Sequence, residues 1–160
     1  MNETLNRIRT SVRSIYGLGN LDEWISKNTR LSGKPYSFTD YEYQIPIIKD
    51  DAKKSIIVKP AQVGLSELAY RWAVASCCVV EDFTCIYIFP TTTDAERNNK
   101  TRIDPMIAES PELRRLVSTN INNSEMKQFG RNSFLMFRGT KSATAALSTP
   151  ANALVLDEFD

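Results

Sequence analysis

Short apolar runs alternate with longer stretches of helical length from residue 55 onward, and this alternation constrains the fold more than any other feature. The expected strands are apolar throughout, which is typical of parallel strands that are covered on both faces. We therefore predict an α/β domain, built on a parallel sheet with helices on both faces. The expected strands cover residues 55–59, 84–89, 133–138 and 153–156, and the expected helices cover residues 66–80, 93–107 and 112–117.

The first fifty residues are less regular than the rest. We expect a helix near the start, a second helix over residues 22–29 and a capped segment over residues 39–49 that Pro46 interrupts. On this basis we divide the chain into an N-terminal helical segment, 1–34, and one domain, 35–160. Because the sequence stops directly after the last expected strand, we expect the domain to be truncated at that strand.

The composition excludes several kinds of chemistry. The chain has no histidine, which excludes Ser-His-Asp catalysis and His-ligated zinc. Three cysteines without CxxC spacing are expected to be free thiols. The net charge of +1 gives no overall sign of nucleic-acid binding. No apolar run approaches the roughly 20 residues of a membrane helix, so we predict no association with a membrane.

A candidate phosphate-binding loop, KPAQVGLS, lies between the first expected strand and the next helix. Loop amides and the positive end of a helix dipole can hold an anion there. Against the usual GxxxxGK[ST] pattern, Gly64 and Ser66 match, whereas Leu65 replaces the lysine and Lys59 replaces the first glycine. The flexible stem of Lys59 can still bring its ammonium to the β- and γ-phosphates. Taken alone, the motif fits an ordinary loop before a helix capped by Ser66 better than a phosphate site.

An apolar strand that ends in two carboxylates, Asp157 and Glu158, supports a phosphate site. In P-loop ATPases the acidic residue at this position holds Mg²⁺ opposite the loop hydroxyl, and an adjacent glutamate can activate the attacking water. We therefore predict a P-loop NTPase-type site for ATP and Mg²⁺. Ser66 and Asp157 are the expected metal ligands, and Lys59 and Glu158 are the expected catalytic residues. The phosphates are expected to contact Lys59 and the loop residues Gln62, Val63, Gly64, Leu65 and Ser66.

In this order, the motifs resemble the large terminase subunit of tailed phages and are most similar to its lambda-type branch. The segments that carry the resemblance are KPAQVGLS, FPTTTDAE, IDPMIAESPELR and FLMFRGTKSATAALSTPANALVLDEFD, within residues 35–160. That family has a variant Walker A motif with an early lysine, which Lys59 matches, and a Walker B motif that ends in Asp-Glu, which Asp157 and Glu158 match. The resemblance also implies that Tyr43 and Gln44 lie beside the adenine.

The resemblance implies a motor that hydrolyses ATP to move double-stranded viral DNA into a procapsid. The implied partners are a small terminase subunit, the portal protein of the procapsid and further copies of the chain, in the host cytoplasm. The coupling motif and the nuclease domain of the family fall beyond residue 160. Two alternatives stay open: a helicase-like P-loop translocase, and a truncated remnant that only binds partners.

Several other residues leave two interpretations open. Arg97 and Arg102 fit an arginine finger or DNA contacts, and they also fit ion pairs on a helix surface. Arg138 and Lys141 fit contacts with the nucleotide or DNA, but they fit loop cations that face water better. Tyr43 fits packing beneath the edge of the sheet as well as stacking on adenine.

Overall fold

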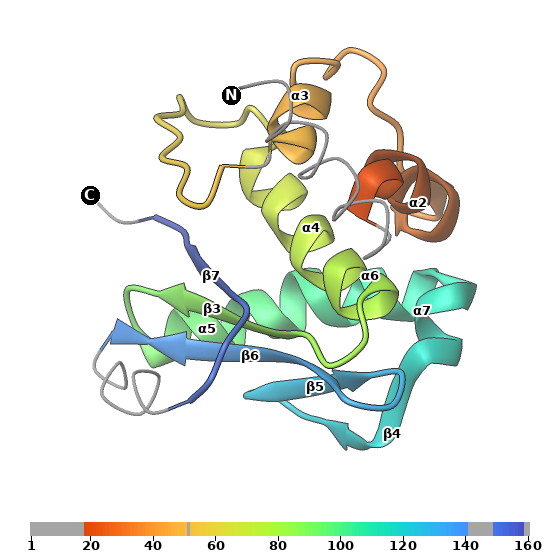
Figure 1. Ribbon diagram of the computed structural model, residues 1–160, viewed down its shortest axis with the longest axis vertical. Helices are drawn as coiled ribbons and strands as arrows, with labels where there is room; N and C mark the ends of the chain where they lie inside the picture. Colours follow the sequence, from red (N-terminus) through yellow and green to blue (C-terminus); the bar gives the residue numbers. More distant parts are fainter. Residues whose placement is uncertain (1–17, 51, 141–148, 159–160) are drawn as a thin grey trace, which may run out of the picture.

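Five strands form the main sheet, in the order β4-β5-β6-β3-β7 (Figure 1). The structure is a computed structural model that describes residues 18–50, 52–140 and 149–158. Strands β6, β3 and β7 run parallel, whereas β5 is antiparallel to both β4 and β6. The strands are β3 (Thr84–Phe89), β4 (Val117–Asn122), β5 (Met126–Phe129), β6 (Ser133–Gly139) and β7 (Ala153–Leu156).

The prediction of a wholly parallel sheet is therefore wrong for the β4–β5 half. Only residues 123–125 separate β4 from β5, and only residues 130–132 separate β5 from β6. A parallel connection needs a crossover of about a dozen residues or more, so connections this short can only make antiparallel pairs.

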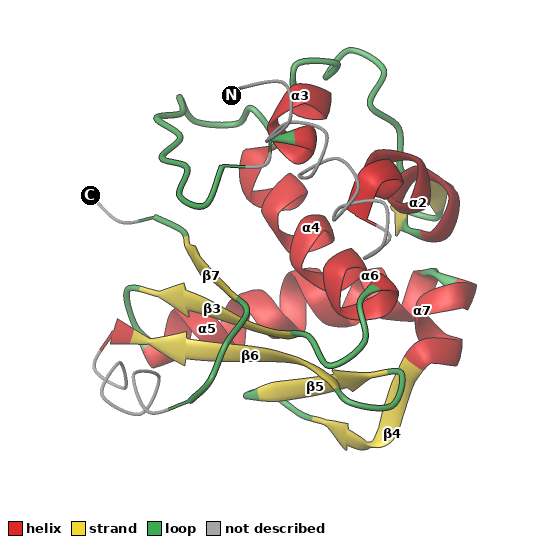
Figure 2. Ribbon diagram, in the orientation of Figure 1, coloured by secondary structure: helices red, strands yellow, loops and turns green. Residues whose placement is uncertain are grey.

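The helices follow the expected order, with small shifts in their bounds (Figure 2). The expected helix over residues 93–107 consists of α5, a π-helix η2 and α6, and the expected helix near the start of the chain lies outside the described residues. No helix in the described ranges is long and apolar enough to cross a membrane. The helical elements are η1 (Leu18–Asn20), α2 (Leu21–Asn28), α3 (Gln44–Lys49), α4 (Leu65–Val79), α5 (Thr92–Asn98), η2 (Asn99–Ile103), α6 (Asp104–Glu109) and α7 (Pro111–Leu116); a small hairpin, β1 (Arg30–Leu31) and β2 (Lys34–Pro35), follows α2.

The predicted strand over residues 55–59 is wrong, because this segment is an exposed loop. Ile56 and Val58 are each 95% exposed. Apolar, β-branched residues indicate a strand only where a neighbouring strand completes its backbone hydrogen bonds. None of the described strands pairs with this segment. The loop nevertheless leads directly into α4, as the sequence predicted.

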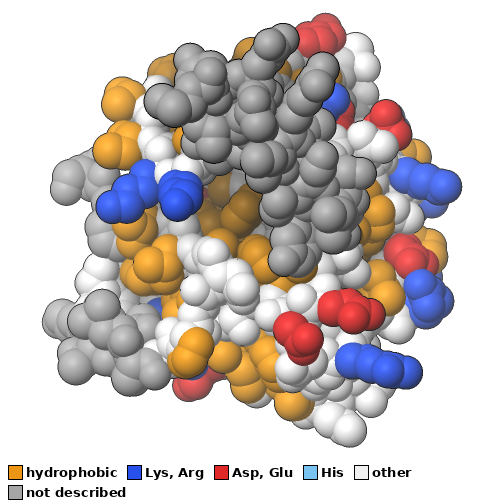
Figure 3. Space-filling view, in the orientation of Figure 1, with side chains coloured by type: hydrophobic (Ala, Val, Ile, Leu, Met, Phe, Trp, Pro, Cys, Tyr) orange, Lys and Arg blue, Asp and Glu red, His pale blue; other side chains and the backbone are white. Residues whose placement is uncertain are grey.

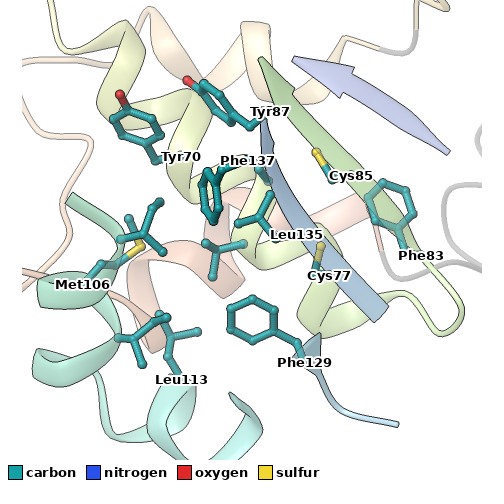
Figure 4. Packing of buried hydrophobic residues seen from close by; sticks show 14 of the residues in the cluster. Tyr70, Cys77, Phe83, Cys85, Tyr87, Met106, Leu113, Phe129, Leu135 and Phe137 are labelled. Carbon is teal, nitrogen blue, oxygen red and sulfur yellow. The ribbon is translucent and has the colours of Figure 1, made fainter. Parts of the chain in front are cut away.

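A buried apolar cluster joins α4, α5, α6 and α7 to one face of the sheet (Figure 4). Strand β3 contributes the alternate residues Cys85, Tyr87 and Phe89, and β6 contributes Leu135 and Phe137. Alternate residues of a strand point to the same face, and the β3–β6 register pairs Cys85 with Leu135 and Tyr87 with Phe137. The described part of the chain therefore places these helices on one face of the sheet, whereas helices on both faces were predicted.

Helix α4 lies between the sheet and the N-terminal elements. Its Val74 and Cys77 belong to the cluster on the sheet, whereas Leu68 and Ala75 pack in a second cluster with α2 and α3. In Figure 1 the end of β7 points toward the first turns of α4. This position brings the loop before α4 to the carboxyl end of the parallel strands, where α/β sheets bind ligands.

Candidate functional site

The loop before α4 turns into the helix through two residues in the left-handed region. Gln62 has a φ of 62° and Gly64 a φ of 72°. A Cβ on Gly64 would lie 3.0 Å from Gln44 Nε2, so both the backbone and the available space favour glycine at this position. Leu65 and Ser66 form the first turn of α4, where backbone N–H groups have no partner within the helix. These N–H groups and the helix dipole make the helix end suitable for an anion.

Three of the predicted site residues meet at this helix end. Lys59 Nζ donates to Ser66 Oγ at 2.5 Å and to Asp157 Oδ1 at 3.2 Å. Ser66 Oγ donates to the same carboxylate oxygen, also at 3.2 Å. The Asp157 side chain is only 9% exposed and that of Lys59 30%, so this ion pair is less screened by water than a surface pair. Lys59 thus forms one polar cluster with Ser66, which is 7 positions away in the sequence, and with Asp157, which is 98 positions away.

The second carboxylate oxygen of Asp157 is held by a residue that the sequence analysis missed. Tyr87, in β3, donates its hydroxyl proton to Asp157 Oδ2 at 3.0 Å. Burial, together with the nearby Asp157 carboxylate, raises the pKa of Tyr87, so this hydroxyl stays protonated. A tyrosine in the otherwise apolar run TCIYIF was the available signal, because a buried hydroxyl needs a polar partner.

Tyr43 and Gln44 contact the backbone of the loop. The Tyr43 hydroxyl and Gln44 Nε2 both donate to the carbonyl oxygen of Val63, the latter at 3.3 Å. Gln44 is buried, and its Oε1 accepts a hydrogen bond of 2.8 Å from the Tyr36 hydroxyl. Tyr43 is 44% exposed, so the alternative in which it packs beneath the sheet edge is wrong. The expected place of these two residues beside an adenine stays a prediction.

A cleft of about 740 Å³ opens beside the loop. Glu158, the predicted catalytic glutamate, is exposed on its wall and has a positive φ of 59°. The cleft is therefore bounded by the loop on one side and by the end of β7 on another. Its lining includes Leu31, Pro35, Tyr36, Tyr41, Gln44, Lys59, Gln62, Val63, Gly64, Leu65, Ser66, Glu67, Tyr70, Asn98, Arg102 and Glu158.

The arginines that had two interpretations differ in their surroundings. Arg97 pairs with Asp94 at 2.6 Å, as expected for a helix surface. Arg102 instead lines the cleft, and its side chain makes no hydrogen bond or ion pair with another residue of the described ranges. Arg138 lies in β6 rather than in a loop, and its guanidinium donates to two backbone carbonyls, at 2.9 and 3.2 Å. Lys141 lies outside the described residues.

On the face shown in Figure 3, charged side chains are mixed over α2 and α7, whereas basic side chains lie together over the loop that precedes α4. Lysine and arginine alternate with aspartate and glutamate over α2 and α7. Ion pairs such as Arg115 with Glu112, at 2.6 Å, belong to this pattern. Over α2 and α7 the described residues therefore form no continuous basic surface on this face.

The oxygen atoms beside the loop fit Mg²⁺. This ion prefers oxygen ligands and is usually bound by one or two carboxylates together with water and substrate phosphates. Ser66 Oγ and Asp157 Oδ1 lie 3.2 Å apart at the helix end. The part of the chain that the structure describes has no cluster of three or more Asp, Glu or Cys residues. The site thus suits a metal ion that arrives with a phosphate ligand better than one bound by protein groups alone.

The fold is mixed α/β, and a loop, a helix end and a carboxylate meet at the ends of its parallel strands. Proteins with this arrangement form a class that is suited to binding phosphate groups. The particular family is shown by comparison with family models. The model described as the ATPase domain of the phage terminase large subunit gpA matches residues 39–160, and the chain belongs to this family. The family match confirms the resemblance that the sequence motifs indicated. No curated protein and no solved structure matched the chain.

Proposed function

We propose that this chain is the ATP-binding and ATP-hydrolysing module of a terminase large subunit. The observation that carries the proposal is the meeting of Lys59, Ser66 and Asp157 at the N-terminal end of α4. A cation, a hydroxyl group and a carboxylate at a helix N-terminus are the groups that P-loop NTPases use for nucleotide phosphates and Mg²⁺. Membership in a family defined by its ATPase domain supports the same function.

In the proposed mechanism, the protein acts mainly by positioning and electrostatics. Backbone N–H groups of residues 62–66 bind the phosphates, and Lys59 neutralises charge on the β- and γ-oxygens. Ser66 and Asp157 hold Mg²⁺, which supplies further charge neutralisation at the phosphates when it is bound. Glu158 lies on the cleft wall directly after Asp157, where its carboxylate can orient the attacking water. This arrangement makes the loop a variant P-loop whose lysine stands at its start.

The motor role follows from the family rather than from the geometry of the site. We propose that hydrolysis drives double-stranded viral DNA into a procapsid, in the cytoplasm of the host. The corresponding partners are the small terminase subunit, the portal protein and further copies of the chain. The mixed charges seen in Figure 3 favour a DNA contact elsewhere than over α2 and α7.

The proposed site is tested by titrating the chain with a fluorescent ATP analogue in the presence of Mg²⁺. We expect saturable binding by the wild type and a loss of about 10- to 100-fold in affinity for Lys59→Ala, because a charge-assisted hydrogen bond contributes about 1.5–3 kcal/mol. Lys49→Ala is the matched control, since Lys49 also pairs with an aspartate, Asp22, at 2.9 Å but lies away from the cleft. Unchanged affinity in a folded Lys59→Ala variant would contradict the proposed role of the early lysine.

A further inference from the structure

We propose that Tyr87 is a positioning residue for Asp157, and that its hydroxyl fixes the orientation in which the carboxylate receives Mg²⁺. This inference rests on the proposed function of the site. The observation behind it is that the two carboxylate oxygens have separate partners. Oδ1 accepts hydrogen bonds from Lys59 and Ser66, whereas Oδ2 accepts one from the Tyr87 hydroxyl at 3.0 Å.

The position of Tyr87 in the sheet explains how its hydroxyl reaches Asp157. Strand β3 lies between β6 and β7, and its register places Tyr87 beside Val155, two residues before Asp157. The side chain is fully buried on the face of the sheet that α4 covers. A tyrosine at this register position is long enough to pass the end of β7, and its hydroxyl meets the carboxylate there.

Aromatic packing holds the Tyr87 ring in place. The ring centroid lies 5.1 Å from that of Tyr70 and 4.8 Å from that of Phe89. Figure 4 shows the hydroxyls of Tyr70 and Tyr87 at the same edge of the cluster. The two hydroxyls have different partners, because Tyr70 donates to Asn98 Oδ1 at 3.0 Å. Tyr87 thus offers a donor whose place is set by packing in the core rather than by the surface of the cleft.

A fixed donor to Oδ2 matters because Lys59 and Ser66 bind only the other carboxylate oxygen, Oδ1. The terminal torsions of aspartates are broad and roughly two-fold, so packing alone selects an aspartate orientation weakly. Groups that orient a metal ligand typically change metal affinity by about 10- to 100-fold when they are removed. Removal of the Tyr87 hydroxyl should therefore weaken the response of the site to Mg²⁺ while leaving the phosphate loop itself unchanged.

The test is Tyr87→Phe, which removes the hydroxyl and keeps the stacked ring. Binding of the fluorescent ATP analogue is measured as a function of Mg²⁺ concentration. We expect the Mg²⁺ concentration for half-maximal binding to rise about 10-fold or more, with analogue affinity at saturating Mg²⁺ close to that of the wild type. Ser133→Ala is the matched control. This substitution also removes a buried hydroxyl, which donates to Val80 O at 2.7 Å, but Ser133 lies at the opposite end of the parallel strands. It should leave the Mg²⁺ dependence unchanged.

A double-mutant cycle separates positioning from a purely structural effect. In an Asp157→Ala background the Tyr87→Phe substitution should have no further effect on the Mg²⁺ dependence, because its target is gone. If Tyr87→Phe responds to Mg²⁺ as the wild type does, even with a lowered melting temperature, the positioning role is overturned and the proposed function stands. If the folded wild type binds no analogue at any Mg²⁺ concentration, the proposed function itself fails.

Discussion

Replacement of Gly64 by alanine adds one methyl group where the loop becomes α4, and we expect it to destabilise both the fold and the site. The first cost is conformational. The φ of Gly64 is 72°, and a residue with a Cβ in the left-handed region costs about 1–2 kcal/mol. The second cost is steric, because the new Cβ would lie 3.0 Å from Gln44 Nε2.

The size of the steric cost depends on whether Gln44 can move. The Gln44 side chain is buried, and both of its amide atoms are hydrogen-bonded. Nε2 donates to the Val63 carbonyl at 3.3 Å, and Oε1 accepts from the Tyr36 hydroxyl at 2.8 Å. Displacement of Gln44 would weaken one or both bonds, and each contributes about 0.5–1.5 kcal/mol. The two costs together predict that Gly64→Ala lowers the free energy of unfolding by about 1.5–5 kcal/mol.

Gly130→Ala is the control that isolates the steric cost. Gly130 also has a positive φ, 57°, but a Cβ on it would meet no atom within 4 Å. This variant should therefore lose only about 1–2 kcal/mol. Urea unfolding, followed by tryptophan fluorescence, measures both values, and titration with the ATP analogue should show weaker binding for Gly64→Ala alone. Equal destabilisation of the two variants would refute the steric argument, and wild-type stability of Gly64→Ala would refute the loop geometry as well.

Three further substitutions test other contacts. Tyr43→Phe removes a hydroxyl that supports the loop carbonyl of Val63; we expect analogue affinity to fall by about 3- to 10-fold, and unchanged affinity would argue against this support. Arg71→Met removes a buried guanidinium that pairs with Glu67; urea unfolding should show a loss of about 3 kcal/mol, and a loss below about 1 kcal/mol would contradict the burial argument. Burial raises the pKa of Cys85 to about 12, whereas a free thiol titrates near pH 8.5. The thiol therefore loses its proton at a lower pH in the unfolded chain than in the folded one. As a result, the free energy of unfolding falls as the pH rises from about 8.5 to about 12. Cys85→Ala should show a shallower fall in urea unfolding over that range, and an identical slope in both proteins would rule out this linkage.

The sequence by itself determined the elements whose patterns are local. Strand β3, with its run of apolar residues, forms over the predicted residues, and α4 begins one residue before its predicted start. The sequence also singled out Lys59, Ser66 and Asp157 as candidate residues of one site, and the structure brings these three side chains together. Their role in binding phosphate and Mg²⁺ stays a prediction. The predictions of β3 and α4 are confirmed because hydrophobic periodicity and the residues that end an element are properties of neighbouring residues.

Only the tertiary structure decided which segments become neighbours. Ile56 and Val58 have strand-like side chains but lie in an exposed loop, since no described strand pairs with them. Tyr87 became part of the site because the β3–β7 register placed its hydroxyl beside Asp157, 70 residues away in the sequence. Strand pairing and register depend on contacts between segments that are far apart in the sequence. The alternation of side chains within one strand decides which residues share a face, but it does not decide which strand lies beside it.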